Sequence, residues 1–233
     1  MPPQLSIFGR TALAAGAAVV SLANPARADL IAVLGDLTSQ PVLRRLRRRI
    51  NSTPEGRSML DALHPARFPE HGSDSLIAMR SLPNGTLGRE YARFMDVRRF
   101  TPESRSAVRF VDDPVDAWVL QRYRDVHDVW HVLTGMPTTV LGELAQKWFE
   151  AAQTGLPVAV ISAVFGPLRL KAEERRVLVT ELVPWAVATG RRAPDLMAVK
   201  YEDRLEDSLE DLRTEWGIQV PDVKMKGLKR KQA

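Results

Sequence analysis

Residues 113–155 read DPVDAWVLQRYRDVHDVWHVLTGMPTTVLGELAQKWFEAAQTG, and this stretch decides the fold. Asp113 followed by Pro114 predicts the start of a helix, because the carboxylate caps free N–H groups and proline has no N–H to leave unpaired. Gly135 is typical of a helix end, and a second helix follows a short turn and ends at Gly155. The stretch therefore predicts a helical hairpin.

The rest of the chain reads as further helices on both sides of this hairpin. Apolar residues recur at helical spacing, as in Leu87, Tyr91, Phe94 and Met95, and no segment alternates with the period of a strand. The length of 233 residues is that of one domain, so the sequence predicts a single all-α domain of about seven to nine helices. Further helices are expected at residues 53–63, at 74–80, at 157–166 as a short buried helix, at 171–189 with a kink at Pro184, and at 194–216.

Both ends of the chain stand apart from the predicted domain, which covers residues 30–220. Residues 1–29 are largely apolar and contain Ala26-Arg27-Ala28 near their end, a pattern typical of a cleaved signal peptide. Because the apolar pattern continues past this point, a retained N-terminal helix is the favoured interpretation. Residues 221–233 form a basic tail. Residues 41–50 predict a helix rich in Arg, which is either a solvated face or a surface that attracts anionic lipid headgroups.

The composition excludes several classes of protein. The body of the chain has no run of about 20 apolar residues, so it is not a polytopic membrane protein. There is no cysteine, which excludes disulfide scaffolds, cysteine zinc fingers, iron–sulfur clusters and thiol nucleophiles. The net charge of +5 favours an anionic partner, and an aromatic content of only 6% argues against nucleic acid as that partner.

Four candidate metal ligands lie in the hairpin: His127, Asp128, His131 and Glu143. The two histidines are four residues apart and so lie one turn apart on one helix face, with Asp128 about 100° further round. Glu143 lies about as far beyond the turn as His131 lies before it, so the two can face each other. This set of nitrogen and oxygen donors suits zinc, iron, manganese or cobalt. Arg124 falls on the same side of the helix.

A buried polar hairpin, in which histidine pairs with carboxylate and no metal is bound, is the structural alternative. The spacing is not that of a zincin, because Asp128 stands where the general-base Glu of that motif would be. The other two histidines, His64 and His71, lie in a proline-rich stretch and are interpreted as loop residues. A metal-dependent hydrolase is a further class of function that such ligands permit.

The motif His127-Asp128-x-x-His131, followed by eleven residues and Glu143, resembles the hallmark of the coenzyme Q biosynthesis protein 4 family. The resemblance to these ubiquinone biosynthesis proteins covers roughly residues 30–220. Further positions that fit the family pattern are Arg122-Tyr123-Arg124, Gly135, Gly142, Lys147, Glu150, Gly155-Leu156-Pro157, Leu87-Gly88-x-x-Tyr91-x-x-Phe94-Met95, Pro184-Trp185-Ala186 and Leu209-Glu210-Asp211-Leu212-Arg213.

The resemblance implies an all-α protein, usually a homodimer, on the membrane face where ubiquinone is made. It implies zinc bound by His127, Asp128, His131 and Glu143, although the donor chemistry also admits iron, manganese or cobalt. It further implies loss of the ring carboxylate at C1 from a 4-hydroxy-polyprenylbenzoate, and contacts with other ubiquinone-biosynthesis enzymes. Because the family-like region begins almost at once, the resemblance favours a bacterial member, peripheral on the cytoplasmic face of the inner membrane.

Two functions from different classes follow. As an oxidative decarboxylase, the chain is expected to use Arg124, Asp128 and Glu143 as catalytic residues, with the Arg124 fork holding the substrate carboxylate. A salt bridge from Arg124 to Asp128 or Glu143 is the structural alternative for that residue. As a non-catalytic lipid-binding scaffold, the chain would organise the other enzymes around a structural metal. The apolar residues 156–165 either line a groove for the prenyl tail or belong to the core.

Overall fold

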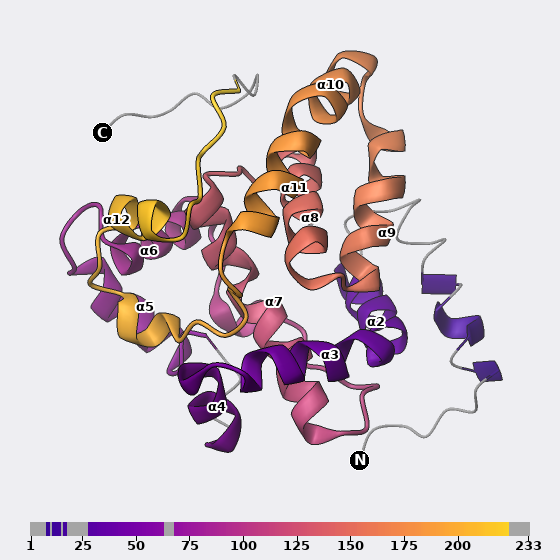
Figure 1. The fold of residues 1–233 in the computed structure, drawn as a ribbon, viewed down its shortest axis with the longest axis horizontal. Coiled ribbons are helices and arrows are strands. Elements are labelled where there is room, and N and C mark those ends of the chain that lie inside the picture. Colours follow the sequence, from indigo (N-terminus) through magenta and orange to yellow (C-terminus); the bar gives the residue numbers. More distant parts are fainter. Residues whose placement is uncertain (1–7, 10, 15, 18–27, 63–67, 224–233) are drawn as a thin grey trace.

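Helix α7, residues Pro114–Thr134, runs through the centre of the fold, and α8, residues Val140–Thr154, follows it after a short turn (Figure 1). The side chain of Asp113 accepts two hydrogen bonds from backbone N–H groups of the first turn of α7. Gly135 ends α7 in the left-handed conformation, with φ at 69°. Sixteen of the 21 residues of α7 are buried, so this helix is the core of the molecule rather than a surface helix.

The computed structural model describes residues 8–9, 11–14, 16–17, 28–62 and 68–223. Over these ranges it contains eleven α-helices and no β-strand, which confirms a single all-α domain with more helices than expected. Most of the N-terminal segment 1–29, His64 and the basic residues of the tail lie outside the described residues. Besides α7 and α8, the helices are α2 (Ala28–Thr38), α3 (Gln40–Asn51), α4 (Pro54–Asp61), α5 (Gly72–Arg80), α6 (Leu87–Arg98), α9 (Pro157–Phe165), α10 (Ala172–Val177), α11 (Val183–Arg192) and α12 (Leu209–Glu215).

The helices pack in two groups around the hairpin. Helices α3, α6 and α8 contact α7, and α5 packs on α6. Helices α9 and α11 cover α8, and these three form the bundle at the upper right of Figure 1. One large apolar cluster, which includes Trp130 of α7 and Phe149 of α8, fills the space between the groups. The hairpin is therefore held from both sides.

The helical segment around Pro184 is continuous but irregular. The sequence predicts one helix over 171–189 with a kink at Pro184, whereas the structure places the irregularity one turn earlier, in the π-helical turn Leu178–Leu182. Pro184 has no N–H to donate to the carbonyl group four residues back. The backbone widens just before it, and the Val183 N–H donates to the carbonyl of Leu178, five residues back. The proline therefore changes the local pitch without ending the helical path.

The prediction of one helix over residues 194–216 is wrong. This segment contains only a 3-10 turn at Tyr201–Arg204 and the short α12. Four consecutive residues from Leu196 to Val199 are buried, which no helix on a surface allows. The side chain of Gln153 binds the backbone of this segment: its Nε2 donates to the Pro194 carbonyl at 3.1 Å, and its Oε1 accepts from the Leu196 N–H at 3.2 Å. The same Nε2 donates to the Gly190 carbonyl near the end of α11 at 2.6 Å.

Helix α9 is only half buried, contrary to the prediction of a buried helix over 157–166. Val158, Ala159 and Ala163 face the core. Val164 and Phe165 are 50% and 47% exposed, and the side chain that follows at Leu168 is 72% exposed. A sequence with apolar residues on every face does not reveal which face meets the core. The outer side of α9 is thus an apolar surface.

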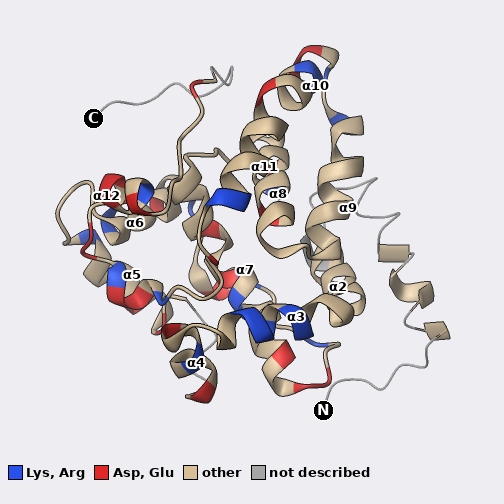
Figure 2. Ribbon diagram, viewed as in Figure 1, with Lys and Arg blue, Asp and Glu red and all other residues tan. Residues whose placement is uncertain are grey.

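The basic helix predicted at 41–50 is α3, and its Arg residues serve the fold. Leu43, Leu46 and Ile50 are buried as the spacing predicts. Arg45 donates to the Thr154 carbonyl at 2.8 Å, at the C-terminal end of α8. Its positive charge also interacts favourably with the dipole of that helix. The others with partners are Arg47, with Asp113 and Asp116, and Arg49, with the Gln153 carbonyl and Asp195. Figure 2 shows this basic stretch crossing below the bundle.

We expect the substitution Gln153→Ala to lower the free energy of unfolding by about 2–4 kcal/mol, because it leaves buried groups at Gly190 and Leu196 without partners. Denaturation in guanidinium chloride measures this change. The matched control is Gln40→Ala at an exposed position, which should change the free energy by less than about 0.5 kcal/mol. Equal effects of the two substitutions would contradict the assigned role of Gln153.

Candidate metal centre

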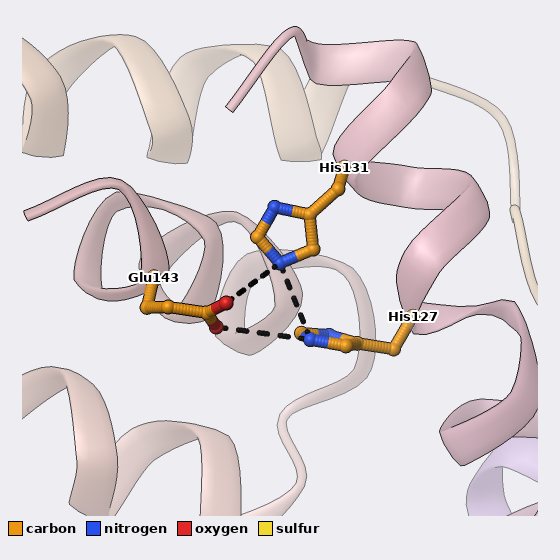
Figure 3. Close-up of side chains that lie close together, drawn as sticks. All are labelled: His127, His131 and Glu143. Atoms are coloured by element: carbon orange, nitrogen blue, oxygen red, sulfur yellow. Dashed lines mark hydrogen bonds and ion pairs between the residues drawn. The ribbon is translucent and has the colours of Figure 1, made fainter. Parts of the chain in front are cut away.

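Three of the four predicted ligands converge: His127 and His131 on α7, and Glu143 on α8 (Figure 3). The two Nε2 atoms are 3.2 Å apart. Oε1 of Glu143 is 3.4 Å from Nε2 of His131, and Oε2 is 3.7 Å from Nε2 of His127. One ligand atom from each residue thus points at a common position, with all three within 4.8 Å of one another. This is the arrangement that a bound metal ion requires.

The turn between α7 and α8 brings Glu143 to the histidines. The side chain of Thr139 accepts from the Gly142 N–H and caps α8, which places Glu143 in its first turn. A Cβ at position 142 would collide with the carbonyl oxygen of Pro137, so only glycine lets the helix start this close to the turn. Thr139 and Gly142, which the sequence marks only as residues of a turn and a helix start, therefore set the distance between α7 and α8 at the site.

His131 is oriented by the backbone. Its Nδ1 lies 2.9 Å from the carbonyl oxygen of Met136, which can only accept, so Nδ1 carries the proton and Nε2 offers its lone pair. The ring is buried and stacks on Phe94, with centroids 5.6 Å apart and an angle of 28° between the planes. Both contacts hold Nε2 toward Glu143.

His127 is oriented by a buried charged cluster whose residues fit the family pattern but have no role predicted from the sequence. Its Nδ1 lies 2.6 Å from Oε1 of Glu150, a side chain with no solvent exposure. The second oxygen of Glu150 contacts Lys147 Nζ at 2.6 Å and accepts from the Tyr123 hydroxyl. A signal was present: Glu150 follows Glu143 by seven residues and Lys147 by three, which places all three side chains on one face of α8.

The charges of the site keep Glu143 ionised and His127 neutral, which are the forms that bind a metal ion. Partial burial opposes ionisation of Glu143, but His131, His127 and Lys147 outweigh it and lower the pKa of Glu143 to about 2. Burial also opposes the charges on Glu150 and Lys147, yet their mutual attraction lowers the pKa of Glu150 and raises that of Lys147. Burial, and then the charge of Lys147, lower the pKa of His127, so its imidazole is neutral. Burial disfavours a charge on His131, but Glu143 raises its pKa.

Asp128, the fourth predicted ligand, is not brought into this group. It is buried and forms an ion pair with Arg105. The reason is its position next to His127, because consecutive helical residues point about 100° apart and only the i, i+4 partner shares the face. Its carboxylate therefore serves the loop before α7 rather than the position shared by the histidines and Glu143.

Arg124, predicted to hold a substrate carboxylate, is also directed away from the site. Its guanidinium donates to Oδ1 of Asp36 at 2.6 Å and to the Ala32 carbonyl at 2.7 Å, both on α2. Neither partner proposed in the structural alternative, Asp128 or Glu143, is the one found. Arg124 fastens α2 to the core helix. His71 is an exposed residue directly before α5, as the sequence predicts, and its side chain makes no capping hydrogen bond.

The donor set fits a divalent metal ion. Two imidazole nitrogens and one carboxylate are a known catalytic zinc set, which keeps further positions for water or substrate. The same residue types also form the facial triad that binds iron(II). Glu143 is 35% exposed whereas His131 is buried, so the free positions face solvent on the Glu143 side. The residues present are therefore suited to zinc, iron, manganese or cobalt.

Comparison with known proteins agrees with the motif. The family described as "Coenzyme Q (ubiquinone) biosynthesis protein Coq4" matches residues 3–222. This chain belongs to the Coq4 family. Among the Coq4 relatives, the mitochondrial ubiquinone biosynthesis protein COQ4 homolog of Homo sapiens is 50% identical over 216 residues, which are 93% of this chain and 80% of that protein. The Bos taurus homolog is 47% identical over 223 residues, 96% of this chain and 83% of that protein.

The fold also has a solved counterpart. A crystal structure of a protein from Nostoc punctiforme superposes with a TM-score of 0.67 and covers 90% of this chain and 98% of its own. Its sequence identity is 24%, so this likeness concerns the fold alone. The family resemblance found in the motif is thus confirmed by the sequence relatives, and the all-α fold by the structure.

We expect Glu143→Gln and His131→Ala each to weaken zinc binding by more than about 100-fold, since each removes a ligand, whereas changes outside the ligand set cost about 10–100-fold at most. Competition with a chromophoric chelator measures the affinity. Asp128→Asn should change it by less than about 3-fold, because that carboxylate faces Arg105. A loss in Asp128→Asn equal to that in Glu143→Gln would show that Asp128 is a ligand after all.

Proposed function

We propose that this chain is a metal-dependent decarboxylase of ubiquinone biosynthesis that removes the ring carboxylate at C1 of a 4-hydroxy-polyprenylbenzoate. Membership of the Coq4 family supports the pathway. The observation that carries the chemistry is the His127–His131–Glu143 group, which offers three ligands and leaves positions open toward solvent. A structural metal site is usually closed by four protein ligands.

The charge of the site supports an anionic substrate. Two neutral imidazoles and one carboxylate leave a divalent ion with one net positive charge, and Lys147 and Glu150 cancel each other behind it. When bound, such an ion supplies Lewis-acid stabilisation of negative charge on a phenolate or carboxylate oxygen. The buried His131 and Phe94 keep water away from one side of that position.

In this proposal the three residues first assigned to catalysis have different roles. Glu143 keeps its predicted place at the reacting position, where it is a metal ligand and lies on the side of the site that faces solvent. Asp128 and Arg124 stabilise the fold, through ion pairs with Arg105 and Asp36.

The reaction also needs an oxidant. Replacing the ring carboxylate of the substrate by a hydroxyl group removes two electrons from the ring, and zinc cannot accept them. The proposal therefore includes dioxygen as the net two-electron acceptor, with or without a redox-active ion in the same site: the ring carboxylic acid, dioxygen and one water give the hydroxylated ring, carbon dioxide and hydrogen peroxide.

We further propose that the chain acts at a membrane surface, as a homodimer in contact with other ubiquinone-biosynthesis enzymes. A polyprenylated substrate resides in a membrane, and the named relatives are mitochondrial. In the part of the chain that the structure describes, no helix has the length and apolarity needed to span a bilayer. The exposed apolar side chains of α9 and the turn after it would provide peripheral contact, on the cytoplasmic face of the inner membrane if the protein is bacterial.

The substitution Glu143→Gln tests catalysis against the alternative of a non-catalytic scaffold. If the chain is the enzyme, release of carbon dioxide from a short-chain polyprenylbenzoate by the metal-loaded protein falls by more than about 100-fold, because a ligand is lost. In cells the carboxylated intermediate accumulates. The matched control is Glu210→Gln on α12, whose side chain is 79% exposed. Full quinone production by Glu143→Gln, with its partners still bound, would establish the scaffold instead.

Membrane contact through α9 is tested by co-sedimentation with anionic phospholipid vesicles. The double substitution Phe165→Ser with Leu168→Ser removes two exposed apolar side chains, and we expect binding to fall by about 10-fold. The control carries Ile77→Ser with Val97→Ser, which are 62% and 75% exposed on α5 and α6. If the control loses as much binding as the α9 variant, the contact surface lies elsewhere.

A further inference from the structure

A buried charged cluster lies behind the metal centre. Its members are Tyr123 and His127 on α7 and Lys147 and Glu150 on α8. Glu150 has no solvent exposure, and the side chain of Lys147 is 18% exposed. The free energy lost when two charges are removed from water exceeds the gain from their attraction unless the geometry is good. Apolar residues of similar size often stabilise a fold better than such a pair. Stability alone therefore does not account for this pair.

The geometry of Glu150 points to His127. Oε1 lies 2.6 Å from Nδ1 of His127, while Oε2 is occupied by Lys147 and the Tyr123 hydroxyl. An ionised carboxylate only accepts hydrogen bonds, so Nδ1 of His127 donates to it. With the proton on Nδ1, the lone pair is on Nε2, the atom that faces His131 and Glu143. The carboxylate thus sets both the tautomer and the direction of the ring.

The two histidines are held by different means. His131 donates to a backbone carbonyl, that of Met136, which no substitution removes. His127 depends on one side chain, that of Glu150, and Lys147 holds the second oxygen of this side chain at 2.6 Å. The orientation of His131 is therefore fixed by the backbone, whereas the orientation of His127 depends on a side chain that mutation can remove.

We propose that Glu150 is a positioning residue of the metal centre, which holds His127 with Nε2 toward the metal position, and that Lys147 fixes the direction of Glu150 by binding its second oxygen. The proposal rests on the metal binding contained in the proposed function, and not on the decarboxylation. A carboxylate that receives the second N–H of a ligating histidine also makes its nitrogen a stronger ligand. Loss of Glu150 should thus weaken metal binding without touching a ligand.

The test separates positioning from stability with three proteins: the wild type, Lys147→Met/Glu150→Gln and Lys147→Met/Glu150→Leu. Changing both residues together avoids leaving one charge buried alone. The Gln variant keeps a neutral acceptor for Nδ1, and the Leu variant keeps none. We expect zinc affinity, measured by chelator competition, to fall about 10-fold in the Gln variant and about 100-fold in the Leu variant. The visible absorption of the cobalt-loaded proteins should shift in the same order.

The matched control is an ion pair outside this cluster, Arg122 of α7 with Glu202, whose guanidinium and carboxylate are 2.7 Å apart. Arg122→Met/Glu202→Leu should alter thermal stability but change zinc affinity by less than about 3-fold. Equal zinc affinity in the wild type and both cluster variants, or an equal loss in the control, would overturn the proposal. Because the readout is metal binding, failure to release carbon dioxide would count against the proposed reaction and leave this result unaffected.

Discussion

The burial of α7 is the constraint on which the rest of the structure depends. A helix with sixteen buried residues, several of them charged, must meet a partner for each charge inside the protein. The partners come from distant parts of the chain, so their pairing fixes how α2, the segment before α7 and the segment after α11 wrap around it. Three such pairs of α7 are Arg122–Glu202, Asp128–Arg105 and, for the half-buried Arg124, Arg124–Asp36. The candidate metal centre lies on the side of α7 where two imidazole nitrogens meet a carboxylate instead.

The local part of this arrangement could be predicted from the sequence. The cap at Asp113, the stop at Gly135 and the four-residue spacing of His127 and His131 are short-range signals, and each holds in the structure. Glu143 could be placed because the turn is short and its position can be counted from both sides. Signals of this kind depend on few residues and on helix geometry alone.

The rest depends on contacts between distant residues, which no periodic pattern contains. Arg124 lies 88 positions from Asp36, so its direction could not be obtained from its angle on the helix. The segment after Pro194 has a helix-like pattern of charges, but Gln153, more than 40 positions earlier, binds its backbone, which forms a turn at residues 195–198 instead of a helix. Tertiary hydrogen bonds of buried groups outweigh helix propensity, which is worth less than about 1 kcal/mol per residue.

The structure also changes the meaning of the net charge of +5. Of the Arg residues on α3, Arg45 and Arg49 bind carbonyl groups at the end of α8, and Arg47 pairs with acidic residues at the start of α7. Beyond α9, Arg175 and Arg176 likewise bind groups of this chain. Charges used in this way attract an anionic surface weakly. The exposed apolar face of α9 then carries most of the proposed membrane contact, and such a contact depends little on ionic strength because salt screens charges and not apolar burial.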